Sequence, residues 1–129
     1  MADHLTDSCI FCKIIRGDLP SYAFLDINPL SDGHALVIPK YHAEFFHQLP
    51  EDHLADILPL AKKIAVASGL DQYNLLQNNG PMAHQVVKHV HFHIIPKPNA
   101  EEGLGVGWPQ KQVEKEDFAI ILSKIKEKL

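Results

Sequence analysis

The sequence lacks the features of a membrane-spanning or exported protein. None of its apolar runs is long enough to cross a bilayer, and residues 1–6 have neither the basic start nor the hydrophobic centre of a secretory signal. We therefore expect a soluble protein of the cytoplasm, with the nucleus as a second location.

The formal net charge is -4, and no dense cluster of lysine and arginine occurs. This argues against a nucleic-acid-binding surface but still allows a small nucleotide as ligand.

Cysteine is scarce, and its two occurrences are close together. Cys9 and Cys12 form a C-x-x-C pair, which in a reducing compartment indicates metal binding or redox chemistry more than a structural disulfide. A thioredoxin-like redox site would need this pair to follow a strand in a βαβ unit, and nothing in residues 1–8 reads as that strand. A zinc site needs two further ligands, which the nine histidines could provide. We favour zinc, with unligated thiols and redox use as the alternatives.

Length and composition are those of one globular domain over residues 1–129. Hydrophobic residues make up 46% and charged residues 22% of the chain, and no internal repeat or linker divides it. Apolar residues at helical spacing predict a scaffold helix over 50–69, bent at Pro59, and an amphipathic C-terminal helix over 113–129. Apolar runs bounded by turn residues predict strands over 22–27, 34–39 and 73–77.

The most informative segment is 89–95, which reads His-Val-His-Phe-His-Ile-Ile. Three histidines alternate with apolar residues, as in a half-buried strand. Because side chains alternate across a strand, the imidazoles should share one face while Val90, Phe92 and Ile94 enter the core. A lone histidine in a strand is usually structural, but three at this spacing make that interpretation improbable. Two chemical interpretations compete: a zinc site, and nucleophilic catalysis by the central histidine with its neighbours orienting it.

This segment resembles the signature of the histidine triad (HIT) family, His-φ-His-φ-His-φ-φ with φ apolar, at every position. The similarity extends from Cys9 to Trp108 and is closest to the Hint-like branch, which acts on nucleoside phosphoramidates. The blocks that carry it are CIFCKII, FLDINPLSDGHALVIPKYH, LLQNNG and HVHFHIIPKP. The resemblance implies an α+β HIT fold, in which a small antiparallel sheet of about five strands, or one fewer, packs with a central and a C-terminal helix. It also implies pairing with a second copy into a continuous sheet.

The resemblance implies catalysis at the α-phosphate of a purine nucleoside 5′-monophosphate derivative. His91 would be the nucleophile that forms a phosphohistidine, with its other ring nitrogen donating to a nearby backbone carbonyl. An imidazole suits this role because it is largely neutral near pH 7, is nucleophilic and leaves readily. His93 would donate to phosphate oxygens, and His34 would line the leaving-group side. The implied nucleotide-binding residues are Phe24 and Ile27 for the base, Asp26 for the ribose hydroxyls, Asn78 for ribose and phosphate, and Gln85 near the phosphate.

The resemblance also assigns a metal and marks two departures. Relatives with the paired cysteines combine them with two histidines, which implies a structural zinc and no catalytic metal. The matching ligands are Cys9, Cys12, His42 and His89. This chain lacks a strand and turn that relatives place just before Tyr22, and it has Val86 where many relatives carry a phosphate-binding hydroxyl.

The leading hypothesis from the sequence is therefore a nucleoside phosphoramidase that works through a covalent histidine intermediate. The closest alternative is a dinucleoside polyphosphate hydrolase of the same family, which would use the same nucleophile on a different leaving group. A nucleotide-binding module with vestigial activity is an alternative from another class. A zinc hydrolase with all three triad histidines as ligands is the least favoured.

Overall fold

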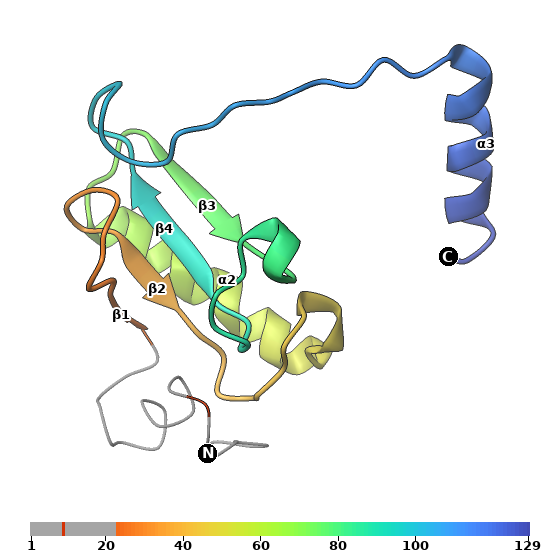
Figure 1. Cartoon of the computed structure of the whole chain (residues 1–129). Coiled ribbons are helices and arrows are strands. Elements are labelled where there is room, and N and C mark those ends of the chain that lie inside the picture. The colour runs from red at the N-terminus through yellow and green to blue at the C-terminus, as the bar shows by residue number, and fades with distance from the viewer. Residues whose placement is uncertain (1–8, 10–22) are drawn as a thin grey trace.

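The computed structural model describes Cys9 and residues 23–129, which Figure 1 shows. Four short strands form an antiparallel sheet in the order β1-β2-β4-β3. The strands are β1 (Ala23–Leu25), β2 (Ala35–Val37), β3 (Tyr73–Gln77) and β4 (Phe92–Pro96), and two 3-10 turns are η1 (Phe46–Gln48) and η2 (Pro81–Ala83). The predicted antiparallel α+β fold is confirmed, with four strands in the described residues.

The helix α2 (Glu51–Ala67) covers one face of the sheet (Figure 1). Two acidic residues in its first turn interact favourably with the positive end of the helix dipole. Ile57, Ala61 and Ala65 recur every fourth residue and are buried in the main core cluster. The predicted scaffold helix is confirmed. Pro59 lies inside it, and the bend expected there stays a prediction.

The histidine segment places its apolar residues as predicted. Val90, Phe92 and Ile94 are buried in the same core cluster as the inner face of α2. The strand itself begins at Phe92, three residues later than expected, because the preceding backbone bonds to loops instead of a neighbouring strand. The amide of Val90 donates to the carbonyl of Ala43 (2.8 Å), and the amide of His89 donates to Val87 (2.9 Å). The first two triad histidines therefore lie in the loop that enters β4.

The C-terminal helix α3 (Lys115–Lys126) forms where an amphipathic helix is expected, but it does not pack on the sheet. All of its residues are exposed, and Figure 1 shows it apart from the sheet at the end of an extended arm. The exposed face includes the apolar side chains Phe118, Ile121, Leu122 and Ile125. Across Cys9 and residues 23–129, no helix is long and apolar enough to cross a membrane.

Two expectations from the sequence lie outside the described residues. One is Cys12, the second cysteine of the C-x-x-C pair. The other is the departure from the family pattern just before Tyr22.

Candidate active site

The face of the sheet opposite α2 carries the catalytic candidates. Register places His93 beside Leu36 on β2 and Leu76 on β3, and Phe24 on β1 pairs with Leu36 in the same row. The hairpin between β1 and β2 brings Asp26 next to His34, because the amide of Asp26 donates to the carbonyl of His34 (2.8 Å). Residues from all four strands and one hairpin thus meet over one patch of the sheet.

His91 is buried, with 8% of its surface exposed. Its Nδ1 lies 2.7 Å from the backbone carbonyl oxygen of His89. A carbonyl can only accept, so Nδ1 carries the proton and the lone pair of the neutral ring lies on Nε2. Burial lowers the pKa of His91, although the bond to His89 and the charge of Asp26 act in the opposite direction. The expected bond to a backbone carbonyl is therefore confirmed, and it leaves Nε2 as the ring nitrogen with a lone pair available to a ligand.

His93 lies between His91 and His34. The ring centroids of His93 and His91 are 4.9 Å apart, and Nδ1 of His93 lies 2.9 Å from Nε2 of His34. Burial, followed by the neighbouring His91 and His34, lowers the pKa of His93 to about 4. Burial also lowers the pKa of His34, while Asp26 acts to raise it. Both rings are accordingly neutral near pH 7.

Asp26 shares its two carboxylate oxygens between the turn and the histidines. Oδ1 accepts from the amide of Asn28 (2.8 Å), and Oδ2 lies 3.6 Å from Nε2 of His34. Asp26 therefore caps the turn that follows β1 and also lies beside the histidine cluster. Ile27, next in the chain, is 90% exposed, so its side chain is accessible to a base, and Phe24 is half-buried.

The loop that leads to the triad is held by Gln85. Its Oε1 accepts from the amide of Gly80 (2.7 Å), and its Nε2 donates to the carbonyl of Glu44 (2.7 Å). Because Gln85 is buried and bonded at both ends of its amide, the geometry favours a role in shaping the loop over the direct phosphate contact expected from the sequence. Asn78 Nδ2 donates to the carbonyl of His84 (3.4 Å) in the same loop, and Val86 is exposed.

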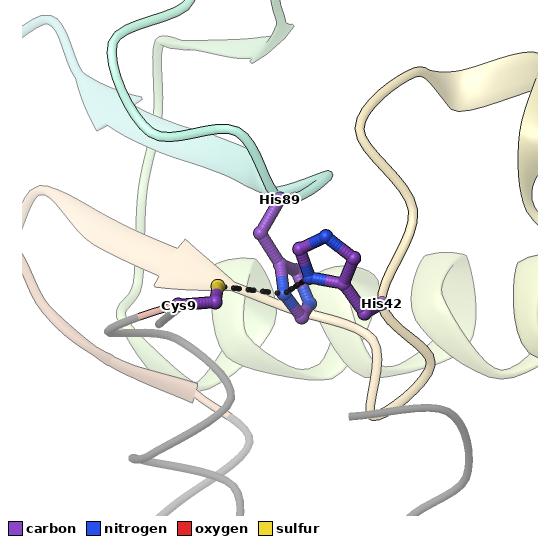
Figure 2. A group of neighbouring side chains, drawn as sticks. All are labelled: Cys9, His42 and His89. Carbon is purple, nitrogen blue, oxygen red and sulfur yellow. Dashed lines mark hydrogen bonds between the residues drawn. The ribbon is translucent and has the colours of Figure 1, made fainter. Parts of the chain in front are cut away.

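A second cluster joins the start of the chain to the triad. Figure 2 shows Cys9, His42 and His89 with their side chains directed toward one another. Nδ1 of His89 lies 3.1 Å from Nδ1 of His42 and 3.3 Å from Sγ of Cys9. Ligand atoms around a tetrahedral zinc lie about 3.3 Å apart for two nitrogens and about 3.6 Å apart for nitrogen and sulfur, so the spacing fits zinc.

The orientation of His89 also fits a metal ligand. Its Nε2 lies 2.9 Å from the carbonyl oxygen of Pro39 and must donate to it, which leaves the lone pair on Nδ1, facing His42 and Cys9. Burial lowers the pKa of His89 to about 4, which keeps the ring neutral as a ligand must be. The structure thus brings together three of the four residues that the resemblance implies as metal ligands, and Cys12 lies outside the described residues.

Sequence reasoning missed the backbone and hydroxyl groups that support these histidines. Ser31 is buried, and its hydroxyl donates to the carbonyl of Pro96 (2.6 Å), which ties the β1–β2 hairpin to the end of β4. The amide of Leu30 donates to Nδ1 of His34 (3.1 Å). No side-chain pattern signals the amide of Leu30 or the carbonyl of Pro39.

Comparison with known proteins assigns the family. Residues 10–100 match the family model described as HIT domain. The adenosine 5′-monophosphoramidase hnt1 of Schizosaccharomyces pombe is 56% identical, over 95% of this chain and 98% of that protein. A crystal structure of a histidine triad nucleotide-binding protein from Candida albicans has a TM-score of 0.87 at 46% identity, covering 93% of this chain and 96% of the other. A HIT family structure from Bacillus subtilis has a TM-score of 0.86 at 38% identity, covering 95% and 98%. The chain, with its triad at residues 89–95, belongs to the HIT family.

Proposed function

We propose that this protein hydrolyses the P–N bond of purine nucleoside 5′-phosphoramidates to give the nucleoside monophosphate. The observation that carries the proposal is the bond from Nδ1 of His91 to the carbonyl of His89, which leaves the Nε2 lone pair on a buried, neutral ring. The activity named for the fungal relative, at 56% identity over nearly the whole of both chains, supports the same reaction class.

The reaction we propose has two displacements at phosphorus. In the first, Nε2 of His91 forms a bond to the α-phosphorus, the P–N bond to the substrate amine breaks, and the leaving nitrogen takes up one proton from solvent. In the second, water bonds to phosphorus, one proton of that water returns to solvent, and the P–Nε2 bond breaks. The products are the nucleoside monophosphate and His91 with its lone pair restored. His93 hydrogen-bonds phosphate oxygens in this scheme, and its ring adjoins that of His91 at 4.9 Å between centroids.

A comparison of substrates tests the proposal. We expect kcat/KM for adenosine 5′-phosphoramidate to exceed that for diadenosine tetraphosphate by about 100-fold, a difference of about 2.7 kcal/mol in transition-state binding. The reverse preference would favour the dinucleoside polyphosphate hydrolase. Tight binding of adenosine monophosphate with no turnover of either substrate would favour a binding module with vestigial activity.

We propose that Asp26 accepts hydrogen bonds from the ribose hydroxyls, while Phe24 and Ile27 flank the base and Asn78 lies near the ribose and phosphate. A charged hydrogen bond contributes about 1.5–3 kcal/mol, so the protein should prefer the adenosine substrate over its 2′-deoxy analogue by about 10-fold or more in kcat/KM. The variant Asp26→Asn is expected to lose most of this preference.

Asp32→Asn provides the matched control for this prediction, because Asp32 is an exposed carboxylate in the same hairpin. Its preference for the ribose substrate should equal that of the wild type. If Asp26→Asn prefers the adenosine substrate over its 2′-deoxy analogue as strongly as the wild type does, Asp26 does not contact the ribose hydroxyls.

We propose that Cys9, Cys12, His42 and His89 bind a structural zinc ion and that the reaction uses no catalytic metal. The ion would anchor the loop before β4 to the N-terminal segment. The support is the spacing of Cys9, His42 and His89 and the orientation of His89 by Pro39. His91 and His93 lie outside this ligand set and stay available for phosphate.

We also propose that two copies associate through the edge strand β3. β3 is five residues long and pairs only with β4 among the strands of the described residues. Two side chains of β3, Tyr73 and Leu75, are half-exposed on the α2 side of the sheet. Pairing of two β3 edges would continue the sheet and cover this apolar surface.

Solution mass tests the association. Analytical ultracentrifugation should give about twice the chain mass of 14.5 kDa. The variant Leu75→Lys, with a charge on the β3 edge, should shift the protein toward monomer. Leu25→Lys, the same change on the opposite edge strand β1, should leave the dimer intact. A monomeric wild type, or dissociation only in Leu25→Lys, would contradict pairing through β3.

A further inference from the structure

We infer that the amide of Leu30 and the ring of His34 fix His93 in the tautomer that carries its proton on Nε2. His34 is then a positioning residue that acts through His93. The inference concerns the protonation sites of two rings, and only its kinetic consequence rests on the proposed function.

Two hydrogen bonds run in sequence from the Leu30 amide to His34 and from His34 to His93. Their donor and acceptor roles follow from the Leu30 amide. The amide of Leu30 can only donate, so Nδ1 of His34, at 3.1 Å, must accept and carries a lone pair. The proton of the neutral His34 ring is consequently on Nε2. That nitrogen lies 2.9 Å from Nδ1 of His93, which must accept in its turn. His93 is therefore left with its N–H on Nε2.

The same bonds disfavour an extra proton on either ring. A proton on Nδ1 of His93 would face the N–H of His34, and a proton on Nδ1 of His34 would face the amide of Leu30. The other titratable groups that act on His93 are His91, which disfavours its charge, and Asp26, which favours it. The lowered pKa values of both rings agree with a neutral pair.

The position of the Leu30 amide relative to β4 is also fixed. Ser31, the next residue, is 5% exposed and donates to the carbonyl of Pro96 at 2.6 Å, at the end of the strand that carries His93. The carbonyl of Leu30 accepts from the amide of Gly103 at 3.0 Å. These two bonds tie the hairpin to the end of β4 and to the loop that follows it, which positions the Leu30 amide relative to His93.

Asp26, His34 and His93 could instead be taken as ligands of a cation, since one ligand atom of each lies within 4.8 Å of the others. A metal on Nε2 of His34 would require that nitrogen to lose its proton. The ring would then need its proton on Nδ1, against the amide of Leu30, or would have to become an anion. The Leu30 bond thus favours the hydrogen-bonded chain over a metal site.

The chemical consequence is a neutral donor at fixed orientation. The Nε2–H of His93 supplies one hydrogen bond to a phosphate oxygen during both displacements, without a change in charge. His34 contributes by preventing the ring of His93 from changing tautomer or turning around. It does not need to contact the substrate.

Nitrogen-15 NMR of the histidine rings in the full-length, zinc-loaded protein tests the inference directly. At pH 7 we expect Nδ1 of both His34 and His93 to resonate as unprotonated nitrogen and Nε2 of both as protonated nitrogen. A proton on Nδ1 of either ring, or a doubly protonated ring, would overturn the inference. Because this measurement needs no turnover, its result is independent of whether the proposed activity is correct.

Two substitutions separate positioning from a merely structural role. Gln can accept from Leu30 and donate to His93, so His34→Gln should keep the His93 nitrogen shifts and lower kcat by less than about 3-fold. In His34→Leu the His93 shifts should move toward a mixture of tautomers, and kcat should fall about 10-fold with little change in KM, as for the loss of one net hydrogen bond. His47→Gln, a change of an exposed histidine, is the control. Unchanged nitrogen shifts of His93 in a folded His34→Leu variant would refute the inference. If that variant does not fold, the tautomers observed in the wild type and in His34→Gln decide whether the inference holds.

Discussion

His91→Ala is expected to abolish turnover of adenosine 5′-phosphoramidate, lowering kcat by at least about 10⁴-fold. Loss of a nucleophile has an effect of this size because the remaining groups can only bind and orient the substrate. The variant should still bind adenosine monophosphate, since Asp26, Phe24 and Ile27 are unchanged. Steady-state kinetics and calorimetric binding measure the two effects.

His47→Ala is the matched control for this variant, because it removes an exposed imidazole to which no role is assigned. Its turnover should stay within about 2-fold of the wild type, as for most surface substitutions. Comparable turnover by His91→Ala and the wild type would eliminate covalent catalysis by His91.

Removal of zinc is expected to destabilise the fold by at least about 3 kcal/mol, or about 10 °C in Tm for a chain of this size. The effect should be large because the ion would link Cys9 to two loops, at His42 and His89, that are distant in sequence. Metal analysis should give one zinc per chain. Thermal unfolding with and without a strong chelator measures the change.

Two histidine variants test whether the loss of stability comes from loss of the metal site and not from another effect of the chelator. His42→Ala should reproduce the loss of stability, whereas His53→Ala, which removes another half-buried histidine, should not. Below its lowered Tm the zinc-free protein should keep its turnover, because His91 and His93 are not ligands in this account. A loss of turnover while the protein is still folded would instead support a zinc hydrolase.

The strand pattern was predictable because a period of two determines which side chains face the core. Val90, Phe92 and Ile94 are buried as that period requires, although the regular strand begins only at Phe92. The start of the strand was not predictable, because it depends on the amide of Val90 bonding to the carbonyl of Ala43, a group that every residue possesses. Side-chain periodicity therefore predicts which face of a strand is buried better than it predicts where the strand begins or ends.

In the candidate site too, the side chains were predictable from the sequence, whereas the backbone groups that orient them were not. Histidine spacing identified His91 and His93, and family resemblance connected His42 and His89 with the cysteines. The groups that orient these rings are the carbonyls of His89 and Pro39 and the amide of Leu30, which leave no mark in a sequence. Gln85 shows the converse, since an amide side chain near the triad was expected to contact phosphate but is bonded at both ends within the protein.

The C-terminal helix marks another limit of pattern reasoning. Amphipathic spacing predicts a helix with an apolar face, and α3 forms at the expected place. The pattern does not specify what covers that face, which is exposed in the single chain (Figure 1).

Rapid-quench mass spectrometry of the intact chain tests the central claim most directly. With a slowly hydrolysed purine nucleoside 5′-phosphoramidate, the account predicts a transient mass increase equal to one nucleotidyl group, located at residue 91 and absent from His91→Ala. Steady consumption of the substrate by a chain that never gains this mass would contradict it.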